Sequence, residues 1–198
     1  MSLYFIIPYI AAVFCGALAV LVLFRDHRSF VHRVFAAGMI TLALEAVLIG
    51  LSIQAQLAET VIQWQRVRLV VGGFIPPIWL LFALSFTREN YRASLERMKW
   101  LLVSCFAIPL VLGMALNKGL IRGVALSDSL VWIIGLGWPG HLLQVFGLLT
   151  IVIVLMGLER TLRASRGHMR WQIKFMVVGL GSLFAVRIYT GGQTVLFR

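Results

Sequence analysis

Six long apolar runs dominate this chain and constrain its fold more than any other feature. Each run has 17 to 22 residues, which is the length that a helix needs to cross a hydrocarbon core about 30 Å thick. We therefore predict an all-α protein, a polytopic transmembrane bundle of six helices. The predicted spans are residues 3–24, 34–53, 69–86, 100–116, 142–158 and 171–190.

The composition supports a membrane protein and argues against a nucleic-acid-binding protein. Hydrophobic residues make up 61% of the chain and charged residues only 13%, whereas soluble domains carry about 25% charged residues. The net charge of +11 would suit nucleic acid only if it formed a basic face on a water-exposed surface. The basic residues here follow the loops instead, so we expect the lipid bilayer as a partner and no nucleic acid.

Basic residues are concentrated on alternate loops, which predicts the orientation of the chain. Twelve of the 18 basic residues follow the first, third and fifth runs. Because cytoplasmic loops are enriched in lysine and arginine, these loops should be cytoplasmic and the N-terminus should lie outside. The twelve residues are Arg25, Arg28, Arg33, Arg88, Arg92, Arg97, Lys99, Arg160, Arg163, Arg166, Arg170 and Lys174.

The longest outer segment, from Asn117 to His141, is interpreted as an interfacial or re-entrant loop. A further span there would bury Asp128 and would place the basic cluster between Arg160 and Lys174 outside, against the charge rule. Six spans that begin outside also end outside. A cytoplasmic output domain would therefore need a seventh span, and we expect this chain to be the N-terminal part of a longer protein.

Two charged residues fall inside the predicted spans. Glu45 lies near the middle of the second run and Arg187 about two-thirds along the sixth, which places them roughly 7 to 8 Å apart in depth. A charge in the membrane costs at least about 2.5–3.5 kcal/mol, so each should find a partner or face water. One interpretation is a switchable intramembrane ion pair; the other is an Arg187 that extends to the outer headgroups and a protonated or hydrogen-bonded Glu45.

The third run contains Gly72, Gly73, Pro76 and Pro77. Proline within a helix removes a backbone donor and displaces the carbonyl four residues earlier, so a kink or opening is expected here. Such a break could serve as a hinge, but prolines in transmembrane helices are also tolerated as packing features. Both interpretations stay open.

Catalytic and cofactor signatures are not found in these 198 residues. None of the four histidines, at positions 27, 32, 141 and 168, has the sequence context of a phosphoacceptor. Neither a metal-ligand cluster nor a glycine-rich phosphate loop is present in the sequence. We predict no catalytic, metal or cofactor-binding residue, and we do not expect this chain alone to be an enzyme.

Two segments resemble a known family. Residues 76–91 read PPIWLLFALSFTRENY and resemble the third helix of the seven-helix sensor region at the N-terminus of some bacterial histidine kinases. Residues 170–175 and 184–190 read RWQIKF and FAVRIYT, and they are similar to the sixth helix of one subgroup, the PEP-CTERM (exosortase-associated) system kinases. Together with the layout of spans, the resemblance covers essentially the whole chain.

The resemblance implies a multi-pass sensor in the bacterial inner membrane. In such a kinase the sensor passes a stimulus to a cytoplasmic dimerisation and phosphoacceptor domain and to an ATP-binding domain. The implied partners are a second copy of the kinase and a response regulator that governs exopolysaccharide and exported-protein genes. ATP would bind only to the kinase domain, which this sequence lacks.

The alternative function is a small transporter or permease subunit. That class requires inverted repeats, broken helices and several polar groups at the midplane. This chain offers Glu45, Gln144, Arg187 and one proline-broken run. A membrane-embedded enzyme is a third class, but no nucleophile or metal set supports it. The sensor is the preferred interpretation.

The charge rule makes a testable prediction of topology. A reporter fused after Arg33, Arg97 or Ser165 should report cytoplasm, and one fused after Glu59, Lys118 or Arg198 should report the outer side. Alkaline phosphatase and fluorescent-protein fusions would measure both. Failure of the alternation at two or more sites would refute the six-span arrangement.

Overall fold

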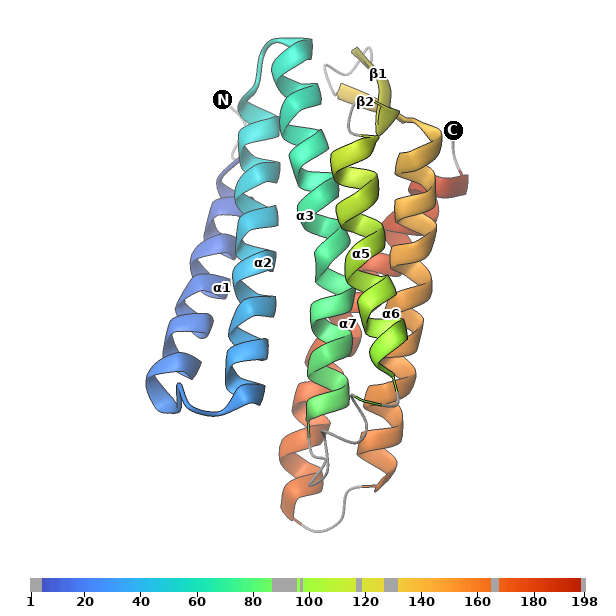
Figure 1. Ribbon diagram of the computed structural model, residues 1–198. Helices are drawn as coiled ribbons and strands as arrows, with labels where there is room; N and C mark the ends of the chain where they lie inside the picture. Colours follow the sequence, from blue (N-terminus) through green and yellow to red (C-terminus); the bar gives the residue numbers. More distant parts are fainter. Residues whose placement is uncertain are drawn as a thin grey trace.

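The computed structural model describes residues 5–86, 96, 98–116, 119–126, 132–164 and 168–196. Asp128, Arg97, Lys118, Ser165 and Arg198, which figure in the predictions above, lie outside these ranges. Within them the chain forms six helices and one two-stranded sheet (Figure 1). The elements are α1 (Ile6–Arg25), α2 (Phe30–Gln54), α3 (Ala58–Ser85), α5 (Lys99–Ala115), β1 (Ile121–Leu126), β2 (Trp132–Leu136), α6 (Trp138–Ala164) and α7 (His168–Leu196).

The helices form an up-and-down bundle in which α3 is central (Figure 1). Helix α3 packs against α2, α5 and α6, while α1 packs on α2 and α7 packs chiefly on α6. The connection from α1 to α2 and the C-terminal end of α6 lie at one end of the bundle, and β1 and β2 lie at the other (Figure 1). The charge rule predicts that the first is the inner end and the second the outer end, and the two halves of the bundle are named accordingly.

Five of the helices are long and apolar enough to span a membrane: Ile6–Arg25, Phe30–Gln54, Ala58–Ser85, Trp138–Arg163 and Lys174–Leu196. The sixth, α5, is an apolar helix of 17 residues. Large apolar side chains such as Phe14, Leu21 and Phe24 are exposed on α1, as expected of a surface that faces lipid rather than water. The predicted all-α polytopic bundle is confirmed.

An aromatic cluster fills the inner half of the bundle. The fully buried Trp79 of α3 makes edge-on contacts with Phe35 of α2, Phe82 of α3 and Phe184 of α7, with ring centroids 5.6, 5.5 and 6.1 Å apart. This geometry is favoured by the aromatic quadrupole. Gly38 permits the close approach, because a Cβ there would lie 2.9 Å from the indole.

Part of the outer segment, interpreted from sequence as an interfacial or re-entrant loop, forms regular structure that was not predicted, and its placement at the membrane interface stays a prediction. Within the described residues it forms an antiparallel pair, in which β1 and β2 are joined from Ile121↔Leu136 to Leu126↔Trp132. Isoleucine, valine and tryptophan favour extended backbone, and pairing satisfies backbone donors and acceptors. Gly140 allows α6 to start against this sheet, because a Cβ there would lie 2.5 Å from the Leu120 carbonyl oxygen.

Helix α3 also differs, because it begins at Ala58 rather than at the start of the apolar run at Leu69. Arg66 and Arg68 precede the predicted third span of residues 69–86, and both lie within this helix. Hydropathy marks where apolar residues begin, but helical hydrogen bonding continues through polar residues whose side chains find partners. The correction brings Arg68 into the bundle.

The close contact at Gly38 predicts a stability difference between two glycine substitutions. Alanine in a helix normally gains up to about 1 kcal/mol over glycine. Gly38→Ala should lose that gain and lower the thermal midpoint in detergent, because its Cβ would meet Trp79. The Cβ of Gly179→Ala would have no neighbouring atom within 4 Å, so this variant should be neutral or stabilising. Equal midpoints for the two variants would contradict the packing described here.

Candidate functional site

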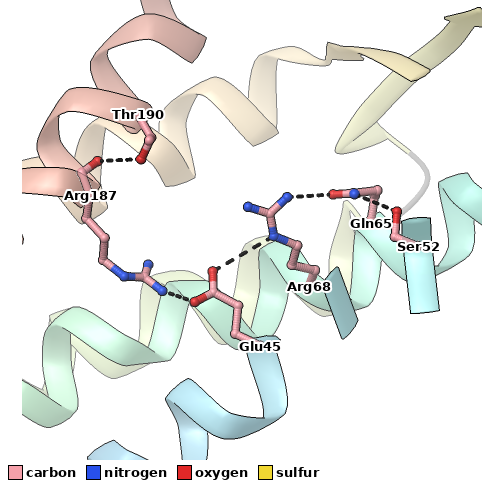
Figure 2. Close-up of polar contacts among 6 residues, drawn as sticks. All are labelled: Glu45, Ser52, Gln65, Arg68, Arg187 and Thr190. Atoms are coloured by element: carbon pink, nitrogen blue, oxygen red, sulfur yellow. Dashed lines mark hydrogen bonds and ion pairs between the residues drawn. The ribbon is translucent and has the colours of Figure 1, made fainter. Parts of the chain in front are cut away.

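Glu45 lies between two arginines in the outer half of the bundle (Figure 2). Its Oε2 accepts a hydrogen bond from Nη2 of Arg187, and its Oε1 lies 3.9 Å from Nε of Arg68. The three residues come from α2, α3 and α7. The structure therefore brings together the two charged residues singled out from sequence, and it adds a third that was not.

Arg68 is held in place by a chain of polar side chains (Figure 2). Its Nη1 donates to Oε1 of Gln65 at 3.0 Å, and Nε2 of Gln65 donates to Oγ of Ser52 at 2.7 Å. Ser52 and Gln65 are both buried, so each needs a hydrogen-bond partner. This chain ties the outer half of α3 to α2 and orients the guanidinium toward Glu45.

Two glycines of α3 create the space for this site. A Cβ at Gly72 would lie 3.3 Å from Oε1 of Glu45, and a Cβ at Gly73 would lie 3.0 Å from Pro109 and 3.1 Å from Leu143. Gly72 thus admits the carboxylate, and Gly73 admits α5 and α6. Helix α3 runs unbroken through the buried Pro76 and Pro77. The structure gives the glycines packing roles, and hinge motion at the prolines stays a prediction.

The site holds two positively charged groups and one negatively charged group. The side chains of Glu45, Arg187 and Arg68 are 12%, 24% and 37% exposed. Two guanidinium groups thus face one carboxylate, and they do so where the dielectric is lower than in water and charge interactions are stronger. Glu45 is the only acidic residue among the described residues that line the surrounding cavity. The site therefore carries an excess of one positive charge.

A cavity of about 560 Å³ adjoins the three charged groups. It lies among α2, α3, α6 and α7, with residues of β2 on its wall, and its volume is in the range of small-molecule sites. Polar residues on its wall are Glu45, Gln65, Arg68, Gln144, Arg187, Thr190 and Thr194. Apolar residues are Ile49, Leu69, Ile134, Leu136, Leu143, Leu148 and Ile151.

Sequence reasoning missed Arg68 and Gln65 because both precede the apolar run of α3. A signal for them was present in the spacing of the residues. Gln65, Arg68, Gly72 and Pro76 follow one another at intervals of three or four residues and all line the cavity. This spacing places residues on one face of a helix. Extending the helical pattern upstream of Leu69 would have found them.

A metal site is not formed by the part of the chain that the structure describes, in which no group of three or more histidine, cysteine, aspartate or glutamate residues is close enough to hold an ion. The two cysteines, Cys15 and Cys105, are free. The chemistry that the site does offer is recognition of charge. It presents guanidinium and amide donors beside an apolar wall in the outer half of a membrane-spanning bundle.

Comparison with protein families identifies the family of this chain. The family described as the N-terminal 7TM region of histidine kinase matches residues 7–196, a range that contains nearly all of the six helices. The chain belongs to this family. Neither the curated proteins nor the solved structures gave a match. This 7TM region is therefore the membrane-embedded sensing region of a histidine kinase, a multi-pass protein of the bacterial inner membrane.

The site predicts a characteristic pattern in a double-mutant cycle. In the isolated 7TM region, Glu45→Gln leaves both Arg68 and Arg187 without a carboxylate, whereas Arg187→Gln leaves Glu45 beside Arg68. Glu45→Gln should therefore destabilise more than Arg187→Gln. The double variant should be less destabilised than the sum, with a coupling of about 1–3 kcal/mol.

Thermal unfolding in detergent would measure the cycle. Arg163→Gln is the matched control, because Arg163 pairs with Glu159 at 2.6 Å while 79% exposed, and exposed pairs contribute only about 0.3–0.5 kcal/mol. Additive effects within about 0.5 kcal/mol would contradict an energetic contact between Glu45 and Arg187.

Proposed function

We propose that this 7TM region detects its stimulus in the outer cavity and that the contact between Glu45 and Arg187 sets its output. The observation that carries the proposal is the position of this contact. It joins α2 to α7 at the wall of a cavity, whereas α7 otherwise packs chiefly on α6. A stimulus that strengthens or weakens the contact would change how α7 is held against the rest of the bundle.

The energy scale of this contact suits a switch. Allosteric coupling typically amounts to about 1–3 kcal/mol, and a partly buried ion pair supplies a coupling of that order. The proposed states differ in whether Arg187 engages Glu45. Arg68 supports both states, since it lies 3.9 Å from the same carboxylate and can compensate Glu45 when Arg187 moves away. Gly72, Gly73, Pro76 and Pro77 are proposed as the place where α3 adjusts during this change.

The output is proposed to be the activity of a cytoplasmic kinase module, reached through a seventh span; the family description as a 7TM region supports this part of the proposal. We assign this module an ATP-binding domain, dimerisation with a second copy and phosphotransfer to a response regulator. The resemblance of residues 170–175 and 184–190 supports placement with the PEP-CTERM system kinases. Control of exopolysaccharide and exported-protein genes follows from that placement as part of the proposal.

The test uses the full-length kinase in membranes and measures basal autophosphorylation and reporter output. Glu45→Gln and Arg187→Gln should each shift the basal level by at least about threefold, because a change of about 0.7 kcal/mol in a two-state equilibrium already does so. If α3 bends at the prolines, the double variant Pro76→Ala with Pro77→Ala should reduce the difference in autophosphorylation and reporter output between the two output states.

Arg163→Gln is again the matched control and should behave as wild type, since it removes an exposed charge outside the cavity. Membrane levels would be measured by immunoblot for every variant. Wild-type output from both Glu45→Gln and Arg187→Gln at normal membrane levels would refute the proposed switch. An unchanged response of the double proline variant would reduce these prolines to packing residues.

A further inference from the structure

We propose that the outer cavity binds a small organic monoanion, a carboxylate joined to an apolar body, with Arg68 as its principal anchor. This inference deepens the proposed function, because it names the class of ligand that the sensing cavity would take. It rests on three features of the described residues: the excess positive charge, the unused donors of Arg68 and the apolar wall.

The charge balance favours an anion with a single charge. Two guanidinium groups and one carboxylate lie at the cavity, so one negative charge from a ligand would complete the balance. A carboxylate carries one charge at neutral pH, whereas a phosphate monoester carries about 1.5 to 2. A cation would meet two arginines, and a neutral ligand would leave the excess charge uncompensated in a partly buried site.

Arg68 is better placed than Arg187 to receive the ligand. Arg187 donates directly to Glu45, whereas Arg68 reaches that carboxylate only at 3.9 Å, beyond hydrogen-bonding distance. Its Nη1 is held by Gln65, which leaves the planar guanidinium with further N–H donors on a side chain that is 37% exposed at the cavity. Guanidinium binds carboxylate through paired hydrogen bonds.

The rest of the wall indicates an organic body attached to the charge. Seven aliphatic side chains line the same cavity, and a small hydrated inorganic anion would leave them without a partner. Gln144, Thr190 and Thr194 add a few polar groups on α6 and α7. A site with mostly apolar walls and few fixed polar groups is typical of small-molecule binding.

A bound carboxylate would also act on the proposed switch. It would compete with Glu45 for the two guanidinium groups, since all three charges lie at one cavity. Arg68, if engaged by the ligand, would no longer support Glu45, and the contact between α2 and α7 would change in strength. Binding and signalling are thus coupled through Glu45.

The experiment measures binding to the purified 7TM region in nanodiscs of zwitterionic lipid. The probes are benzoate and octanoate, each compared with its neutral amide. Acetate is a further probe, because it has the carboxylate without the larger apolar part. Calorimetry and thermal stability would report binding. Both carboxylates should bind saturably, and the amides and acetate should bind at least about tenfold more weakly, because charge-assisted hydrogen bonds or apolar contacts are lost.

Two variants locate the site. Arg68→Gln should weaken carboxylate binding at least about tenfold, whereas Arg163→Gln should bind as wild type. Because Arg68→Gln can also affect folding, Gly147→Leu provides a second test. A Cβ at Gly147 would meet only Pro76, at 3.9 Å, so a larger side chain there should fill the cavity and abolish binding while the charges stay intact.

Equal binding of carboxylate and amide would refute charge recognition, and unaltered binding in both variants would refute the location. No saturable binding of either carboxylate would refute the inference as a whole.

A second experiment repeats the measurement in nanodiscs that contain phosphatidylglycerol. Loss of benzoate binding there, with stabilisation by the lipid alone, would overturn the assignment to a free organic acid and identify an anionic headgroup.

The proposed function can fail independently of this inference. Saturable binding that depends on Arg68, together with wild-type kinase output in Glu45→Gln and Arg187→Gln, would support the ligand and refute the switch. A shifted output in those variants without carboxylate binding would support the switch and refute the ligand.

Discussion

The carboxylate of Glu45 and the two guanidinium groups beside it impose a constraint on the whole outer half of the bundle. A charge removed from water is tolerated only with a partner, so α2, α3 and α7 must keep a register that holds Glu45, Arg68 and Arg187 together. Ser52 and Gln65 extend this polar contact along α2 and α3. Gly72 leaves the room that the carboxylate occupies.

The two halves of the bundle are built differently. Aromatic side chains around the fully buried Trp79 fill the inner half and connect α2, α3 and α7. The outer half instead encloses a cavity of about 560 Å³ with charged groups on its wall. A packed region resists rearrangement, whereas a cavity beside an ion pair can exchange contacts at a smaller cost. This difference suits the proposed function, in which the outer half responds to a stimulus and the inner half stays packed.

The helices and the two intramembrane charges, Glu45 and Arg187, could be identified from sequence for a simple reason. Each helix must hide its backbone from lipid, so apolar length alone reports its presence, and Glu45 and Arg187 stood out because charge is rare in such segments. Arg68 did not stand out, because a hydropathy pattern assigns polar residues next to a span to a loop. The strands β1 and β2 were missed because the segment that contains them was interpreted as an interfacial or re-entrant loop.

Apolar length and loop charge alone therefore determined the class of this protein, its membrane location and the two residues most expensive to bury. These properties depend on transfer between water and lipid, which is local to each segment. Only the tertiary structure decided that Glu45 meets Arg187, that Arg68 joins them and that a cavity opens beside all three. These properties depend on how separate helices are rotated and spaced, and no single segment encodes that geometry.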